Sequence, residues 1–253
     1  SVTGVQTCAL PIFITLNEPN VVLGLGYLRG IFPPGKKSIF QFWRARKNML
    51  CAHQKLYDKI KKLRLDLPTG ITQYCANWDY SGKSLLLKFL FQKAEDWYNW
   101  SFQKKIAPRQ DFIGFNYYRT IGVGLRFPWK DLKKDGLSND LGWGFYPEGL
   151  KKIALRARKN FSLPTYVFEN GLADSQDRLR GRFLNEHLAA LAEANRQVGD
   201  VRSYFHWSLM DNFEWAHGYW PKFGLVEVDF ETMERRPRPS FQVYQTIIRK
   251  NQS

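Results

Sequence analysis

The sequence has few cysteines and no long apolar run. Its 253 residues contain three cysteines, Cys8, Cys51 and Cys75, with no CxxC pair. A disulfide framework is therefore not expected, and the thiols are typical of a reducing compartment. No apolar stretch reaches the roughly 18 residues of a membrane helix, and no signal-peptide pattern opens the chain. We therefore predict a cytoplasmic protein with no membrane partner.

Metal-ligand and nucleic-acid patterns are also missing. The four histidines have no ligand spacing, so no metal site is expected. The net charge of +15 at pH 7 would suit a polyanion partner. However, the basic clusters at 44–47, 59–64 and 156–159 lie in helix-like segments without the aromatic interleaving of nucleic-acid-binding surfaces. We interpret them as solvated helix faces and predict no nucleic-acid partner.

The pattern along the chain is an alternation of short apolar runs with longer helical segments. With 44% hydrophobic and 24% charged residues, the composition suits one large globular domain. The alternation predicts βαβ units and a parallel sheet. Asp177 is a candidate N-cap for the fourth helix. The runs occupy 12–16, 70–75, 112–116, 165–168 and 202–209, and the helices about 38–63, 83–100, 147–160 and 177–198, with another after Pro239.

Two carboxylates stand where apolar runs end. Glu18 follows the first run and Glu169 the fourth. In parallel α/β folds the carboxyl ends of the strands carry the ligand site, so both side chains are expected on one rim. Such a pair suits glycoside hydrolysis, in which retaining enzymes hold the two groups roughly 5 to 5.5 Å apart. Asn17 is placed to bind a sugar hydroxyl, and Tyr118 to donate a hydrogen bond to Glu169.

Several ordered motifs resemble glycoside hydrolase family 1, the β-glucosidase and β-galactosidase group. "TLNEPN" at 15–20 and "VFENG" at 167–171 are similar to its two catalytic signatures. The resemblance covers about residue 12 to the end. It implies a (β/α)8 TIM barrel, of which this chain carries roughly strands 4 to 8. The further similar motifs are "GFNYY" (114–118), "GWGFYPEGL" (142–150), "YFHWSLMDNFEWAHGY" (204–219) and "FGLVEVDF" (223–230).

The resemblance also implies a role for each matching residue. It makes Glu18 the acid/base and Glu169 the nucleophile. The implied substrate-binding residues are Asn17 at the sugar 2-hydroxyl, Tyr118 beside the nucleophile, Trp207 under the sugar ring, Glu214 and Trp215 at the far hydroxyls, and Phe223 in the wall. Plainer interpretations remain open, since Trp207 and Phe223 also suit core packing and Glu214 also suits a solvated loop.

The implied function is a retaining β-glycosidase that removes terminal β-linked glucose- or galactose-type residues by double displacement, without a cofactor. A carboxylate at Glu214 would repel a sugar phosphate, which favours a neutral β-glucoside or β-galactoside as substrate. Two alternatives stay open: a non-catalytic sugar-binding or scaffold remnant, and a transglycosidase that uses the same residues. The sequence leaves the oligomeric state undetermined.

The start of the chain departs from the family pattern. Residues 1–11, "SVTGVQTCALP", do not resemble the family's lead-in, and we interpret them as non-native. Residues 12–253 are then the C-terminal portion of a single glycosidase barrel. Five strands cannot close an eight-stranded barrel. We therefore predict an incomplete barrel that, as this chain alone, has little or no activity and poor solubility.

Overall fold

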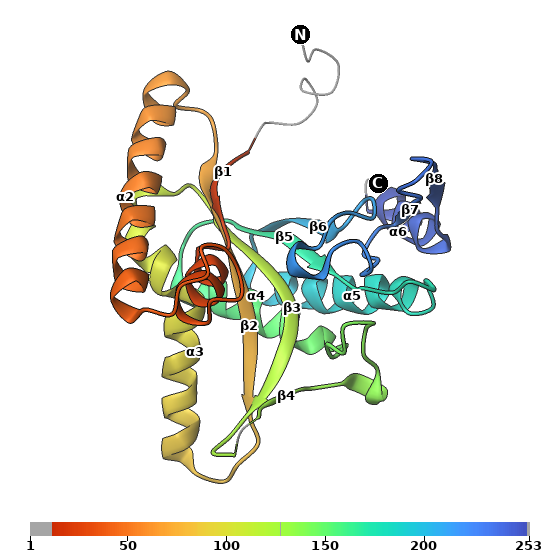
Figure 1. Ribbon diagram of the computed structural model, residues 1–253, viewed down its shortest axis with the longest axis horizontal. Helices are drawn as coiled ribbons and strands as arrows, with labels where there is room; N and C mark the ends of the chain where they lie inside the picture. Colours follow the sequence, from red (N-terminus) through yellow and green to blue (C-terminus); the bar gives the residue numbers. More distant parts are fainter. Residues whose placement is uncertain (1–11, 127, 252–253) are drawn as a thin grey trace.

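A curved, mostly parallel sheet organises the molecule (Figure 1). The computed structural model describes residues 12–126 and 128–251. The strand order is β1-β2-β3-β5-β6, and the short β4 pairs antiparallel with β3. The predicted α/β class is confirmed. The strands are β1 (Phe13–Asn17), β2 (Thr69–Tyr80), β3 (Ile113–Val123), β4 (Lys130–Asp131), β5 (Thr165–Gly171) and β6 (Val201–Trp207).

Helices connect the parallel strands and pack on the sheet. The long ones are α2 (Ile39–Leu63), α3 (Leu85–Ile106), α4 (Pro147–Asn160), α5 (Arg180–Val198) and α6 (Pro239–Lys250). The short ones are α1 (Pro19–Val21), a π-helical turn (Val22–Leu28) and the 3-10 turns Ala107–Arg109, Lys134–Gly136 and Trp215–His217. A separate antiparallel pair, β7 (Val226–Val228) and β8 (Arg235–Pro237), precedes α6.

Side-chain caps mark the starts of two long helices. Ser38 Oγ accepts the Gln41 N–H before α2, and Ser84 Oγ accepts the Leu87 N–H before α3, each at 3.3 Å. Each bond satisfies one N–H that has no partner inside its helix. At α4, Pro147 occupies the first turn, where its missing N–H costs nothing.

The predicted N-cap at Asp177 is wrong. Helix α5 begins at Arg180, and Asp174 Oδ2 accepts the N–H groups of Leu179 and Arg180 at 2.7 and 3.1 Å. Asp177 instead pairs with the buried Arg180 guanidinium and accepts the Ser240 N–H at 2.8 Å, at the start of α6. A buried guanidinium requires a charged or hydrogen-bonding partner. Asp177 supplies that partner to Arg180, so its carboxylate does not cap α5 as the local sequence pattern predicted.

The main core lies between the sheet and helices α3, α4 and α5. Small residues such as Ala154 and Ala157 on α4 and Ala194 on α5 let the helices approach closely, while larger rings fill the space over the strands. Full burial of each large apolar side chain contributes about 1.5–3 kcal/mol. The buried cluster comprises Cys75, Trp100, Ile113, Phe115, Tyr117, Leu150, Ile153, Ala154, Ala157, Val167, Leu191 and Ala194.

The opposite face of the sheet carries a layer of aromatic rings. The Phe168 ring lies 5.4 Å from Phe112 and 5.7 Å from both Tyr166 and Phe205, measured between centroids. A Cβ added to Gly114 would lie 2.7 Å from the Phe168 ring, so this position requires glycine. Phe205, on the edge strand β6, is 47% exposed. This is the face that a closed barrel would enclose.

The sheet is open at two edges, β1 and β6. The molecule is therefore a half-barrel, and the predicted incomplete barrel is confirmed. The predicted poor solubility and the assignment of residues 12–253 to one domain stay predictions. Residues 1–11, interpreted above as a non-native lead-in, lie outside the described residues.

Strands β2 and β3 extend further than the sequence pattern suggested. They stay paired as far as Tyr80 and Val123, whereas the apolar runs ended at 75 and 116. The extension is covered by aromatic packing, with the Phe91 ring of α3 5.4 Å from Tyr80 and 5.8 Å from Trp129. The extended parts of β2 and β3 have a mixed polar and aromatic sequence, so a search for continuous apolar runs does not detect them.

Candidate active site

The carboxyl ends of the strands bring the predicted residues to one rim. Glu18 directly follows β1, and Glu169 lies near the end of β5. Asn116, in the central strand β3, pairs in register with Glu169. The rim is thus built by parallel strands that share a direction, although its residues are far apart in the chain.

Glu18 adopts an unusual backbone conformation. Its φ of 46° and ψ of 54° lie in the left-handed region, which non-glycine residues rarely occupy. Its N–H donates to Thr72 O at 2.8 Å, and its carbonyl accepts the N–H groups of Val21 and Val22. These bonds hold the strained residue in place. Such strain is concentrated at functional sites in proteins.

Asn116 lies between the two carboxylates, bonded to Glu18 and paired in strand register with Glu169, and was not among the predicted site residues. Its Nδ2 donates to Glu18 Oε1 at 2.8 Å and to Asn17 Oδ1 at 3.3 Å. The Thr72 hydroxyl donates to Asn116 Oδ1 at 2.6 Å and so fixes the orientation of the amide. The sequence signal that could have identified Asn116 was an amide within the apolar run "FIGFN". The structure buries this side chain fully.

Glu169 is surrounded by hydrogen-bond donors. The Tyr118 hydroxyl donates to its Oε2 at 2.8 Å, as the sequence predicted. Burial raises the pKa of Glu169, and hydrogen bonds from Tyr118, Asn116 and Asn17 act against that rise. Donors that bond the ionised form keep a carboxylate available as a nucleophile.

Glu18 has the environment of a proton donor. Burial, the nearby charge of Glu169 and, to a smaller extent, that of Glu214 raise its pKa to about 8, although the hydrogen bond from Asn116 lowers it. The carboxyl therefore holds its proton near neutral pH. Two carboxylates whose surroundings differ in this way match the division of work between an acid and a nucleophile.

Glu214 faces the same site from the loop after β6. Its Oε1 accepts the Trp207 indole N–H at 2.9 Å, which joins two of the predicted substrate-binding residues. Burial raises the pKa of Glu214, and the bonds from Trp207 and Asn212 oppose this. Its charge contributes to the raised pKa of both Glu18 and Glu169, so the site contains three acidic side chains whose ionised forms disfavour one another.

A buried ion pair braces the loop that carries Glu214. Both guanidinium NH groups of Arg238 donate to Asp211, at 3.1 and 2.9 Å. Asp211 also accepts the N–H groups of Gly224 at 2.9 Å and Val228 at 3.4 Å. The loop is thereby tied to the segment around β7 and β8, which follows it in the chain.

The last two predicted residues differ in their surroundings. Phe223 is buried, and its ring lies 6.2 Å from Tyr118 and 6.3 Å from Trp143. Trp215 is 68% exposed, and its ring stacks at 6.3 Å on Phe32. The structure thus places Phe223 against the other site residues, whereas the ring of Trp215 packs on the exposed side of the site against Phe32. Their roles toward a sugar stay predictions.

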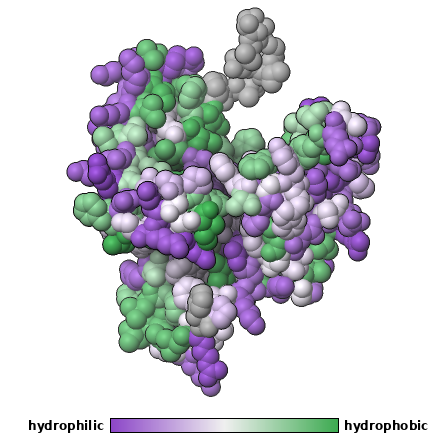
Figure 2. Space-filling model, in the orientation of Figure 1, coloured by the Kyte–Doolittle hydropathy of each residue, from purple (hydrophilic) through white to green (hydrophobic). Residues whose placement is uncertain are grey.

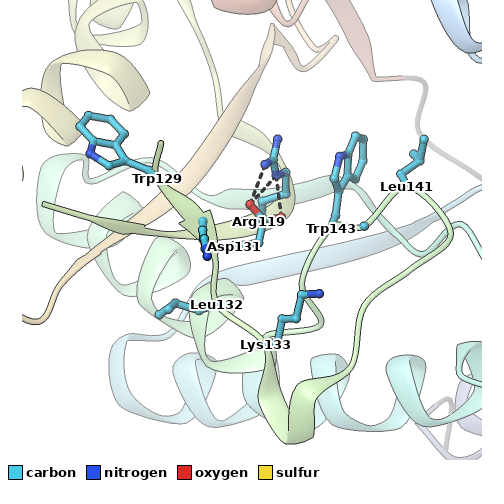
Figure 3. Close-up of a pocket in the computed structure, with 9 residues that line it drawn as sticks. Arg119, Trp129, Asp131, Leu132, Lys133, Leu141 and Trp143 are labelled. Carbon is cyan, nitrogen blue, oxygen red and sulfur yellow. Dashed lines mark hydrogen bonds and ion pairs between the residues drawn. The ribbon is translucent and has the colours of Figure 1, made fainter. Parts of the chain in front are cut away.

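An open pocket of about 610 Å³ borders this site. Figure 3 shows Arg119 and Asp131 paired within it, with an Nη2–Oδ1 distance of 2.6 Å. Trp143 belongs to both regions, because its ring also lies 5.8 Å from Tyr118. The pocket is lined by Arg119, Trp129, Lys130, Asp131, Leu132, Lys133, Leu141, Gly142 and Trp143.

Within residues 12–126 and 128–251, no group of three His, Cys, Asp or Glu side chains is placed to hold a metal ion. The chemistry available from the described side chains is proton transfer and nucleophilic attack by carboxylates.

A parallel half-barrel with a carboxylate pair on its rim is typical of barrel glycoside hydrolases. The sequence model of glycosyl hydrolase family 1 matches residues 8–83 and 99–253. The chain belongs to this family.

Similar proteins agree with this assignment. A β-galactosidase of Sulfolobus acidocaldarius is 36% identical over 94% of this chain and 55% of the relative. A crystal structure of a β-glucosidase from Pyrococcus furiosus superposes with a TM-score of 0.86 and 35% identity, covering 94% of this chain and 54% of that one. A Thermotoga maritima β-glucosidase in complex with glucoimidazole gives a TM-score of 0.86 at 26% identity, with 94% and 63% covered. The chain thus spans about half the length of the Sulfolobus and Pyrococcus proteins.

Proposed function

We propose that the protein to which this chain belongs is a retaining β-glycosidase that acts on neutral terminal β-glucosides or β-galactosides. The observation that carries the proposal is the meeting of Glu18 and Glu169 at one buried site, where the charge of Glu169 helps raise the pKa of Glu18 and Tyr118 donates a hydrogen bond to Glu169. Relatives named β-galactosidase and β-glucosidase support the substrate class.

In the proposed reaction, Glu169 attacks the anomeric carbon while Glu18 gives its proton to the departing oxygen. The resulting glycosyl ester on Glu169 is then hydrolysed by a water molecule that Glu18, now ionised, deprotonates. Loss of the Glu18 proton is favoured at that stage, because formation of the ester neutralises Glu169 and removes one repelling charge. No cofactor is needed for either step.

Glu214 supports the preference for a neutral sugar. Its carboxylate interacts with the charges of both Glu18 and Glu169. A phosphorylated sugar would add further negative charge to this group of carboxylates. Trp207, held by its bond to Glu214, is proposed to provide a flat surface under the sugar ring. We also propose a cytoplasmic location, in keeping with the thiols noted above.

We further propose low turnover for the 253-residue chain by itself, because the open sheet surrounds a sugar on only part of its circumference. Hydrolysis of an aryl β-glucoside by this chain at a rate comparable to that of an intact family member would contradict this.

The mechanism is tested in a chimera that places the preceding segments of the Pyrococcus furiosus β-glucosidase before Ile12. A 2-fluoro-glucoside should label Glu169, identified by peptide mass spectrometry. Glu169→Gln should abolish labelling and turnover for every leaving group, whereas Glu227→Gln, an exposed control on β7, should change neither. Glu18→Gln should slow substrates with poor leaving groups far more than dinitrophenyl glycosides, which need no protonation. Labelling elsewhere, or equal losses for all leaving groups in Glu18→Gln, would overturn the assignment.

A further inference from the structure

Helix α3 carries two sets of large apolar side chains, one buried and one exposed. Its inner face packs on the sheet through buried residues such as Trp100, Phe102 and Ile106. A second set of large apolar side chains points outward and is between 50% and 82% exposed. A helix that is apolar all round is normally covered on both sides. This set, called here the outer face of α3, consists of Leu85, Leu86, Phe89, Leu90 and Trp97.

The outer face is not at an edge where the sheet could be extended. Helix α3 packs on β2 between α2 and α4, whereas the open edges of the sheet are β1 and β6. Figure 2 shows apolar side chains gathered over the lower part of this helix. Residues 84–98, which carry all five side chains, also lie outside the two ranges matched by the family model. The family model therefore does not describe this feature.

The charge around the outer face has one sign. The exposed charged side chains of residues 81–97 are Lys83, Lys88 and Lys93. The two acids of this stretch are withdrawn: Glu95 is buried in an ion pair with Arg156, and Asp96 is only partly exposed. Lys93 Nζ lies 5.3 Å from the centroid of the Phe89 ring, so a cation and an aromatic ring share this surface.

The start of helix α2 continues the same surface. The ring of Trp43 lies 6.2 Å from Trp97, and Phe40, one turn earlier, is 75% exposed. Residues 19–57 contain no acidic residue at all. They contain seven basic ones: Arg29, Lys36, Lys37, Arg44, Arg46, Lys47 and Lys55. Aromatic side chains of both α2 and α3 thus lie beside these basic residues.

We propose that the outer face of α3, together with the start of α2, binds the surface of an anionic lipid bilayer. Leucine and phenylalanine side chains would enter the boundary between headgroups and acyl chains, the tryptophans would lie at its level, and the lysines would meet the lipid phosphates. The association is peripheral, since no helix of the described residues is long and apolar enough to cross a membrane. It departs from the expectation, drawn from the sequence, that no membrane takes part.

The charges distinguish a bilayer from two other occupants. A second copy pairing through this face would bring two sets of lysines together without an opposing carboxylate. A nucleic acid would satisfy the lysines but leave Leu85, Leu86 and Leu90 without apolar contact. An anionic bilayer is the surface that matches both the cations and the aliphatic side chains.

The test is flotation of the 253-residue chain with vesicles of phosphatidylcholine alone or with about 30% phosphatidylglycerol. Flotation is chosen because aggregated protein sinks and cannot imitate binding. We expect the parent chain to float with the anionic vesicles only, and less so in high salt. Leu86→Ser with Leu90→Ser should weaken binding by about tenfold or more per side chain. Lys88→Gln and Lys93→Gln should weaken it about fivefold each.

Matched controls separate the surface from general effects. Leu65→Ser, at a leucine that is 80% exposed beyond the end of α2, and Lys159→Gln, at the end of α4, should leave flotation unchanged. Circular dichroism melts check that each variant folds as the parent does. The proposal is overturned if the parent does not float or if the variants float equally well. It is also overturned if the face instead mediates a dimer, seen by sedimentation, or a shift of duplex DNA.

Discussion

Replacing Glu18 with glutamine should stabilise the folded chain at pH 8. The raised pKa of Glu18 means that the folded state keeps its proton where the unfolded chain releases it. The contribution of this group to stability is therefore fully present below pH 4.5 and is lost as the pH rises toward about 8. Glutamine has nearly the same shape, cannot ionise and can still accept the 2.8 Å hydrogen bond from Asn116.

The size of the effect follows from the same numbers. A pKa that rises from 4.5 to about 8 corresponds to a ceiling of about 5 kcal/mol between the two protonation states. Glu18 shares its charge interactions with Glu169, and a buried amide also has a desolvation cost. We therefore expect Glu18→Gln to gain about 2 kcal/mol at pH 8, roughly 0.7 M in the urea midpoint for an m-value near 3 kcal/mol/M. At pH 5 the gain should nearly vanish.

The assay is urea unfolding of the parent and the variant at pH 5 and pH 8, followed by tryptophan fluorescence. Glu227→Gln, which removes an exposed carboxylate on β7, serves as the control and should show no comparable pH-dependent gain. A variant no more stable than the parent at pH 8, or equally stabilised at both pH values, would refute the reasoning. A higher free energy of unfolding for Glu18→Gln at pH 8 would mean that the Glu18 carboxylate lowers the stability of the folded chain, as functional residues often do.

Three further predictions concern the supports of the site. Tyr118→Phe removes a hydrogen-bond donor to the ionised form of Glu169, so the pKa of Glu169 should rise further in a carbon-13 NMR titration. Labelling of Glu169 by a fluoroglycoside in the chimera should slow by about tenfold or more. An unchanged titration of Glu169 would contradict this role of Tyr118. Asn116→Ala removes an amide shared by both carboxylates and should lower turnover of the chimera by about tenfold or more, while Asn116→Asp should be worse still because it adds a charge. Asp211→Asn leaves the buried Arg238 without its counter-charge and should cost about 3–5 kcal/mol in thermal unfolding; a loss below about 1 kcal/mol would show that the pair is not a brace.

Local pattern was sufficient for much of the fold. Apolar runs of four to eight residues alternating with amphipathic helices identified the strands β1, β2, β3, β5 and β6 and the helices between them. The start of α4 followed from Pro147, whose chemistry acts within one turn. The pattern failed where distant residues intervened. Asp177 was expected to cap α5, but it serves the buried Arg180 and the start of α6. The extensions of β2 and β3 were missed because ring packing, rather than continuous hydrophobicity, holds them.

The candidate site shows the same division. Motifs identified Glu18 and Glu169, and the bond from Tyr118 to Glu169 was expected and is present. Asn116 was not predicted as a site residue, because its role depends on reaching Glu18 from β3 across β2, where Thr72 orients its amide. The pKa difference between the carboxylates likewise depends on burial and on charges brought together by the fold.

The sequence by itself determined the family, the parallel α/β class and the two acids at strand ends, because these depend on residue type and on short-range order along the chain. Only the tertiary structure decided how those acids are linked, which loop is braced beside them and which helix face remains uncovered. Those features depend on distances between segments separated by tens to more than a hundred residues, and such distances exist only once the sheet has formed.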